Sequence, residues 1–154
     1  MTTLADLLKP EHVQLHPRAT SRDAAIREIA GLLENDVQVL DWKELHRSVK
    51  ASAPCIMEEG AQFCLCIPHA RTAAVTEMVM SVGRFARDLR FEGVAMPVRY
   101  LVCIAVPPEL ATDYLRIIGL LARIAKDPQA EPEIYHAATP EEFIGTLARL
   151  EAKL

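Results

Sequence analysis

The sequence lacks an excess of basic residues. Lysine and arginine together number 17, against 21 aspartate and glutamate residues, and the formal net charge at pH 7 is −4. Proteins that bind duplex nucleic acid normally carry a positive surplus that neutralises phosphate groups. The charge therefore argues against nucleic acid as a partner.

Long hydrophobic runs are also missing. No stretch of about 18 uncharged apolar residues occurs, so we expect no transmembrane helix. Residues 1–9 contain Asp6 and lack the basic region with which a signal peptide begins. We therefore expect a protein of the cytoplasm that does not insert into a membrane.

A C-x-x-C pair is missing among the four cysteines, Cys55, Cys64, Cys66 and Cys103. They lie among apolar residues, which predicts buried free thiols in a reducing cytoplasm. Cys64, Cys66 and His69 can be read as three metal ligands, but C-x-C is shorter than the usual zinc spacing and no second ligand pair follows. A disulfide between Cys64 and Cys66 is sterically poor within an extended strand. We expect neither a metal nor another cofactor.

Internal repeats, low-complexity segments and interdomain linkers are absent as well. The 154 residues suffice for one domain with its own core. About half of them are hydrophobic (51%) and a quarter are charged (25%), as in an average globular protein. The sequence therefore predicts a single domain over residues 1–154.

Hydrophobic periodicity predicts helices and strands in the order α, β, α, α, β, β, β, α, α. The expected helices cover residues 4–8, 20–36, 41–53, 109–126 and 139–154, and the expected strands cover 12–16, 63–67, 75–85 and 98–106. Thr20 and Asp41 are the expected N-caps of the second and third helices, and Thr139 with Glu142 forms a capping box for the last. Neighbouring strands imply antiparallel pairs, and helices at both ends of the chain can cover both faces of a sheet. We predict a three-layer α/β fold whose mixed sheet is flanked by helices on both faces.

The segment that carries the most chemical information is Cys66-Ile-Pro-His-Ala-Arg71. Pro68 ends ladder pairing, so His69 should emerge at the sheet edge in a loop after the strand of residues 63–67. A neutral imidazole is a competent nucleophile near neutral pH, and Arg71 can stabilise an anion beside it. An ordinary loop histidine and a solvated arginine are the alternatives.

These residues resemble the active-site signature of the mannitol/fructose-type enzyme IIA domains of the bacterial phosphotransferase system, which include the nitrogen-regulatory enzyme IIA proteins. The resemblance spans nearly the whole chain. It includes residues 20–30 as the first long helix, 97–107 as the central strand, 114–122 as the following helix and 137–143 as the start of the last helix. It implies the three-layer α/β fold predicted above.

In that family the histidine after Ile-Pro carries a phosphoryl group, which makes His69 the phosphoacceptor. The implied donor is an HPr-like phosphocarrier protein, and the implied acceptor is an enzyme IIB component or a regulatory target. Arg71 is the candidate for phosphate stabilisation. Tyr114 occupies the position of the family's second active-site histidine, where it either bonds a phosphate oxygen or simply packs.

The active site departs from the family pattern in other positions too. The loop of residues 52–60 lacks the family's arginine and contains Glu58 and Glu59. Lys50 is a candidate substitute for that arginine, but its spacing differs by a few residues. Two functions therefore remain open, ahead of a third, a metal-binding or thiol-redox role. The chain is either a phosphotransferase that relays a phosphoryl group through His69, which the retained Pro68, His69 and Arg71 favour, or a diverged binding module that docks on regulatory proteins.

Overall fold

The computed structural model describes residues 2–56, 64–86 and 89–154. Its helices are α1 (Leu4–Leu7), α2 (Arg22–Ala30), α3 (Trp42–Lys50), α4 (Ala111–Lys126), α5 (Ala130–His136) and α6 (Pro140–Ala152). Its strands are β1 (Val13–Gln14), β2 (Cys55–Ile56), β3 (Cys64–Cys66), β4 (His69–Arg71), β5 (Val79–Arg84) and β6 (Val98–Val106). None of the described helices is both long and apolar enough to cross a membrane.

The strands form one mixed sheet with β6 at its centre. The order is β1-β5-β6-β3-β2, and β4 also pairs with β6, beyond the end of β3. β5 runs antiparallel to β6, whereas β3 and β4 run parallel to it. Because β4 follows β3 along the same side of β6, the residues after Cys66 are carried to the C-terminal end of the central strand.

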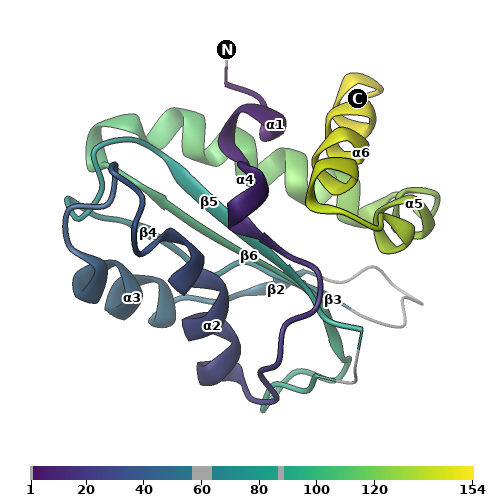
Figure 1. Ribbon diagram of the computed structural model, residues 1–154, viewed down its shortest axis with the longest axis horizontal. Coiled ribbons are helices and arrows are strands. Elements are labelled where there is room, and N and C mark those ends of the chain that lie inside the picture. The colour runs from purple at the N-terminus through teal and green to yellow at the C-terminus, as the bar shows by residue number, and fades with distance from the viewer. Residues whose placement is uncertain (1, 57–63, 87–88) are drawn as a thin grey trace.

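Side chains of β6 alternate between two hydrophobic cores, as expected for a strand buried on both faces. Val102, Ile104 and Val106 belong to the core under α1, α4, α5 and α6. Leu101 and Cys103 belong to the core under α2 and α3. Figure 1 shows the two helical layers on opposite sides of the sheet, which confirms the predicted three-layer α/β fold.

Capping residues set most of the helix boundaries. Asp41 accepts from the Glu44 amide and begins α3, as predicted. Thr139 caps α6 and accepts from the Glu142 amide, but the Glu142 carboxylate accepts from the Ala138 amide, so only the Thr139 half of the expected box is present. Ser21 and not Thr20 caps α2, because the Ser21 hydroxyl accepts from the Ala24 amide, and α2 ends at Ala30 rather than at residue 36.

Short elements account for most differences from the prediction. The strands β2 and β4 and the helix α5 were not expected, and β5 begins at Val79 rather than at residue 75. β2 and β4 are two and three residues long, which is too short for a periodic pattern, and they exist because they pair with β3 and β6. α3 ends at Lys50, three residues before the predicted end.

The prediction of four free thiols is wrong for two of them. Cys55 of β2 lies opposite Cys66 of β3 in antiparallel register, with a Cα–Cα distance of 4.1 Å, and the two form a disulfide. Cys64 and Cys103 are free and buried, as predicted. The pairing of β2 with β3 brings the bonded cysteines together, and a strand as short as β2 leaves no hydrophobic period from which that pairing could be predicted.

Candidate active site

His69 begins strand β4 rather than lying in a loop, which corrects one part of the prediction. It pairs with Ile104 of β6, and its amide donates to the Ser52 carbonyl at 3.0 Å on the other side. Among the described residues β6 is the only strand that pairs with β4, so the predicted place at a sheet edge is confirmed. The side chain is half-buried.

One hydrogen bond orients the His69 imidazole. Its Nδ1 lies 2.7 Å from the Ile67 carbonyl oxygen. A carbonyl only accepts, so Nδ1 carries the proton in the neutral ring, and the lone pair is left on Nε2. The contact therefore makes Nε2 the nucleophilic atom.

Tyr114 lies beside His69, as predicted. Their ring centroids are 5.6 Å apart, with 44° between the ring planes. His69 is in register with Ile104, whose side chain belongs to the core under α4, so both rings lie on the same face of the sheet. Tyr114 is 6% exposed, and burial raises the pKa of its hydroxyl to about 12, despite an opposing effect of Arg71. The side chain is therefore neutral at pH 7 and can donate a proton in a hydrogen bond.

Arg71 lies two residues beyond His69 on the same strand and therefore on the same face. It is exposed, and within the described part of the chain it has no ion-pair partner. Its charge acts on the Tyr114 hydroxyl. The three predicted site residues are thus brought together at one end of β6.

The first turn of α4 adds a source of positive potential to this end of the sheet. Tyr114 is the fourth residue of the helix, and the N-cap residue Leu110 supplies no side-chain hydrogen bond to the first turn. Amides of an uncapped first turn and the helix dipole favour a bound anion. A cavity of about 460 Å³ also adjoins this turn, but it is lined by Leu110 and Asp113 and not by His69.

Lys50 does not join the site. Its ammonium lies 3.7 Å from the Asp23 carboxylate, at the end of α3 in the layer opposite α4. Glu58 and Glu59 lie outside the described residues. Of the two cations considered from the sequence, Arg71 lies on the strand and face of His69, and Lys50 does not.

The metal alternative that combined Cys64, Cys66 and His69 is not supported by the described residues. The cysteines that cluster there are Cys55, Cys64 and Cys66, without His69. Sequence reasoning also missed the backbone carbonyls of Ser52 and Ile67, which hold the His69 amide and imidazole. Every residue has a backbone carbonyl, so the sequence does not single out these two. The fold brings the Ser52 carbonyl to the His69 amide, and the local backbone places the Ile67 carbonyl against the ring.

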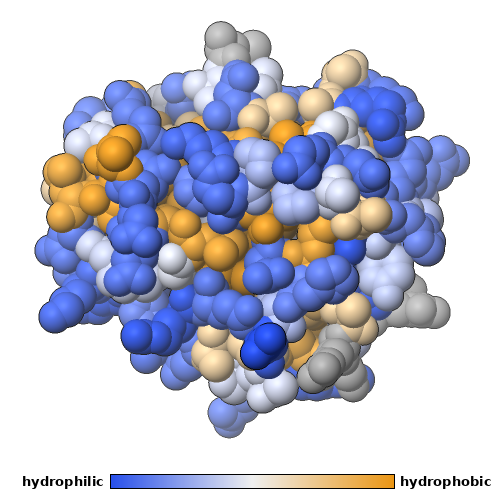
Figure 2. Space-filling view, viewed as in Figure 1, coloured by the Kyte–Doolittle hydropathy of each residue, from blue (hydrophilic) through white to orange (hydrophobic). Residues whose placement is uncertain are grey.

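Exposed hydrophobic side chains gather at this end of the molecule. Val37 and Leu40 are 89% and 67% exposed, in a connection that is joined to the chain just after β4 by the pairing of Val39 with Val75. Leu115, next to Tyr114, is 67% exposed. Figure 2 shows a hydrophobic region at the left of the view, where α4 begins, bordered by hydrophilic residues. Such a surface is typical of a transient docking site.

The sequence and structure were compared with known proteins. The family profile "Phosphoenolpyruvate-dependent sugar phosphotransferase system, EIIA 2" matches residues 6–149. The PTS system 2-O-alpha-mannosyl-D-glycerate-specific EIIABC component of Escherichia coli (strain K12) is 30% identical over 156 residues, covering 96% of this chain. The chain spans 23% of the length of that protein.

Solved structures share the fold. The nitrogen regulatory protein IIA-Ntr from Neisseria meningitidis superposes with a TM-score of 0.79 at 19% identity, covering 94% of this chain and 98% of that one. IIA mannitol from Escherichia coli gives a TM-score of 0.70 at 19% identity, covering 91% and 98%. A complex of enzyme IIA mannitol with phosphorylated enzyme IIB mannitol from the same organism gives 0.68 at 17% identity, covering 92% and 97%.

Proposed function

This chain belongs to the phosphoenolpyruvate-dependent sugar phosphotransferase system EIIA 2 family, and we propose on that premise that His69 is its phosphorylated residue. The observation that carries the proposal is the hydrogen bond from Nδ1 to the Ile67 carbonyl. It leaves the Nε2 lone pair available on a half-buried ring at a sheet edge, where a partner protein can reach it. The proposed donor is the phosphohistidine of an HPr-like phosphocarrier protein.

In the proposed step, the Nε2 lone pair attacks the phosphorus atom of the donor. The new N–P bond forms as the donor's N–P bond breaks, and the donor imidazole leaves with the electron pair. Such transfers require alignment and charge stabilisation more than covalent help. Arg71, the Tyr114 hydroxyl and the first-turn amides of α4 are the groups that support the charge of the phosphoryl oxygens.

The phosphoryl group then passes to an enzyme IIB component or is used to regulate a target protein. A related enzyme IIA has been solved with its phosphorylated IIB partner, which supports the first of these. The exposed Val37, Leu40 and Leu115 are the proposed docking residues. Phosphocarriers act in the cytoplasm, so the proposed location of this protein is the cytoplasm.

Incubation with phosphoenolpyruvate, enzyme I and HPr-type proteins, followed by intact mass spectrometry, tests the proposal. Wild type should gain the mass of one acid-labile phosphoryl group, and His69→Ala should gain none. His16→Ala, which removes an exposed histidine, is the matched control and should be phosphorylated like wild type. Arg71→Ala should slow transfer by about tenfold to a thousandfold.

The second candidate function is a diverged binding module that docks without transferring phosphate. The observation that favours it is Tyr114, which is neutral and buried where the family has a second histidine. If several phosphocarriers leave wild type without added phosphate, the enzyme proposal is rejected in favour of this one.

A further inference from the structure

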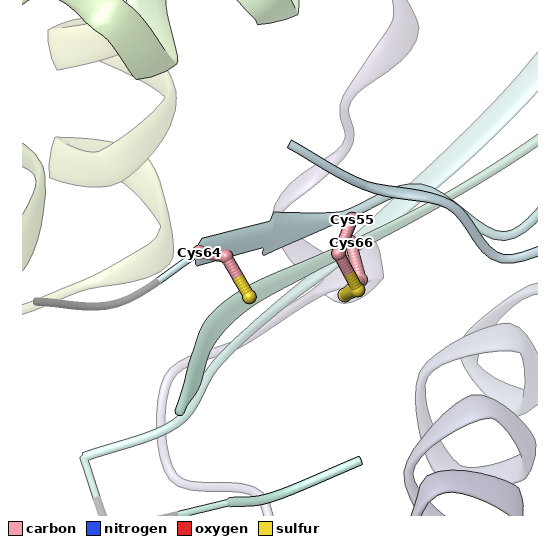
Figure 3. Close-up of side chains that lie close together, drawn as sticks. All are labelled: Cys55, Cys64 and Cys66. Carbon is pink, nitrogen blue, oxygen red and sulfur yellow. A yellow bond between two sulfur atoms is a disulfide. The ribbon is translucent and has the colours of Figure 1, made fainter. Parts of the chain in front are cut away.

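Three cysteines form a cluster close to the candidate active site. The sulfur atoms of Cys55, Cys64 and Cys66 all lie within 4.8 Å of one another, on the face of the sheet that packs against α2 and α3 (Figure 3). Cys55 and Cys66 are joined by the disulfide, and Cys64 remains a thiol. Phosphotransfer at His69 uses no sulfur atom, so the cluster is not explained by the proposed function.

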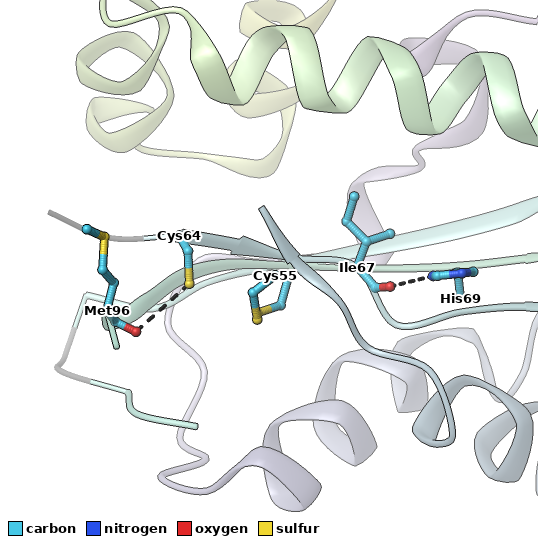
Figure 4. The surroundings of a disulfide bond; sticks show 6 residues. Cys55, Cys64, Ile67, His69 and Met96 are labelled. Carbon is cyan, nitrogen blue, oxygen red and sulfur yellow. Dashed lines mark hydrogen bonds between the residues drawn. A yellow bond between two sulfur atoms is a disulfide. The ribbon is translucent and has the colours of Figure 1, made fainter. Parts of the chain in front are cut away.

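The disulfide fastens the segment that holds His69 in place. Cys55 belongs to a stretch whose carbonyls bond the active-site strand: Pro54 O accepts from the Ile67 amide at 2.9 Å, and Ser52 O accepts from the His69 amide at 3.0 Å. The Ile67 carbonyl in turn accepts from the His69 imidazole (Figure 4). A covalent bond at Cys55–Cys66 therefore secures the backbone that orients the ring.

We propose that the Cys55–Cys66 pair is a thiol–disulfide exchange site and that its oxidation state sets how firmly the His69 imidazole is held. The co-reactant is a dithiol, either a small molecule or a dithiol protein. The effect on backbone and ring is independent of what His69 does. Only the consequence for phosphotransfer rests on the proposed function.

The exchange begins at Cys55, the more exposed residue of the pair. Cys55 is half-buried, whereas Cys66 is 0% exposed, so a thiolate of the dithiol attacks Cys55 Sγ. The S–S bond breaks, and Cys66 Sγ leaves with the electron pair and takes a proton. The second thiol of the dithiol then attacks the mixed disulfide, and Cys55 Sγ leaves and is protonated. Two electrons and two protons reach the protein, and the dithiol departs as a cyclic disulfide.

Cys64 is the natural control within the cluster. Burial raises the pKa of the Cys64 thiol, so it remains protonated and unreactive near pH 7. Cys55→Ala and Cys64→Ala each remove one sulfur atom from the same cluster. Only Cys55→Ala removes the disulfide.

Amide hydrogen exchange tests the coupling without any phosphoryl donor. In wild type reduced with dithiothreitol, and in Cys55→Ala, the Ile67 and His69 amides should exchange at least about tenfold faster, relative to amides of the β5–β6 ladder. The oxidised wild type and Cys64→Ala should retain slow exchange. Nitrogen chemical shifts of His69 should report a smaller share of the Nδ1–H tautomer in the reduced protein. Unchanged exchange and tautomer after complete reduction would overturn the proposal.

Phosphotransfer gives a second readout that separates the two proposals. Reduction and Cys55→Ala should slow phosphorylation of His69 by about threefold to tenfold, because a less firmly held ring spends less time aligned. Equal rates in both oxidation states, together with unchanged exchange, would reject the redox coupling and leave the proposed function standing. Changed exchange with no phosphorylation from any carrier would reject the proposed function and leave the coupling standing.

Metal binding is the competing explanation for three clustered cysteines. The reduced protein is therefore titrated with Zn²⁺ alone and examined by native mass spectrometry. If one Zn²⁺ binds through all three cysteines and restores slow exchange at Ile67 and His69, the cluster is a metal site and the redox proposal falls. If no Zn²⁺ binds, the exchange site is supported.

Discussion

The His69 ring is oriented by one main-chain oxygen and placed next to one aromatic ring. The Ile67 carbonyl fixes which nitrogen carries the proton, and Tyr114 lies at 5.6 Å between ring centroids. Both contacts come from chain segments that flank β6 at its C-terminal end. At the scale of single residues, the site therefore consists of an imidazole with a defined tautomer, one neutral hydroxyl and one exposed guanidinium.

Tyr114 offers a direct test of how the site stabilises a phosphoryl group. Tyr114→His should raise the rate of phosphotransfer by about tenfold, because an imidazolium can carry charge that a phenol cannot. Tyr114→Phe keeps the ring and removes the hydroxyl, so it should slow the reaction. Stopped reactions analysed by intact mass provide both rates. If the Tyr114→His and Tyr114→Phe rates both equal the wild-type rate, Tyr114 only packs against His69.

His46 should make stability depend on pH. Burial, with the charges of Arg27 and Lys50, lowers the pKa of His46 below its usual value of about 6.5. Below that pH the unfolded chain binds a proton that folded His46 resists, so the free energy of unfolding falls as the pH falls from 7 to 5. His12 contributes in the same direction, because burial lowers its pKa more than Asp36 raises it.

Urea denaturation of His46→Phe checks this assignment. His46 stacks on Trp42, and its Nε2 is buried without a hydrogen bond, so phenylalanine keeps the stacking and removes the titrating group. As the pH falls from 7 to 5, the free energy of unfolding should fall less in the variant than in wild type. If the free energy of unfolding depends on pH identically in both proteins, the pKa of His46 does not change on folding.

At the scale of elements, the Ile29 side chain of α2 occupies the space where a Cβ on Gly83 of β5 would lie. A Cβ placed on Gly83 would lie 2.3 Å from Cδ1 and 2.6 Å from Cγ1 of Ile29. The Ser81 hydroxyl also donates to the Ile29 carbonyl at 2.7 Å, which holds the helix against the strand. The packing of this layer therefore depends on glycine at one position.

Gly83→Ala should lower the free energy of unfolding by about 1–3 kcal/mol, because the added methyl group forces Ile29 away from the strand. Gly119→Ala in the exposed middle of α4 is the matched control, since its Cβ meets no atom within 4 Å. It should raise the free energy of unfolding by about 0.5–1 kcal/mol through helix propensity. Chemical denaturation of both variants measures these free energies of unfolding. A Gly83→Ala protein as stable as wild type would contradict the close packing.

At the scale of the whole molecule, exposed hydrophobic residues and the candidate active site share one end. Val37 and Leu40 come from the connection between α2 and α3, Leu115 comes from α4, and His69 comes from β4. Helical layers on both sides of the sheet thus contribute to a single surface around the C-terminal end of β6. That arrangement suits the proposed transfer of a phosphoryl group from one partner protein to another.

Replacing Val37 and Leu115 together by serine should raise the KM for the phosphocarrier by about threefold to tenfold, with a smaller effect on kcat. Both side chains are exposed, so the variant should fold like wild type. Leu154→Ser, which changes an exposed leucine at the C-terminus, should leave KM unchanged. Phosphorylation by a small donor such as phosphoramidate should be the same in all three proteins. A KM equal to that of wild type in the double variant would place docking elsewhere.

The sequence by itself determined the long elements and the central residue of the site. β6 and α4 are long enough for their hydrophobic patterns to be read directly, and Asp41 and Thr139 mark helix starts through local hydrogen bonds. The motif around His69 and the resemblance it carries indicated the family. These features depend on neighbours in the chain, so they are visible before folding.

Only the tertiary structure decided how the site is held. β2 and β4 exist because β3 and β6 pair with them, and the resulting backbone arrangement brings Cys55 to Cys66 and the Ser52 carbonyl to His69. A backbone oxygen has the same chemistry in every residue, and a cysteine does not specify its partner. Strand pairing supplies both contacts, and strands of two or three residues leave no hydrophobic period in the sequence, so neither contact could be predicted from it.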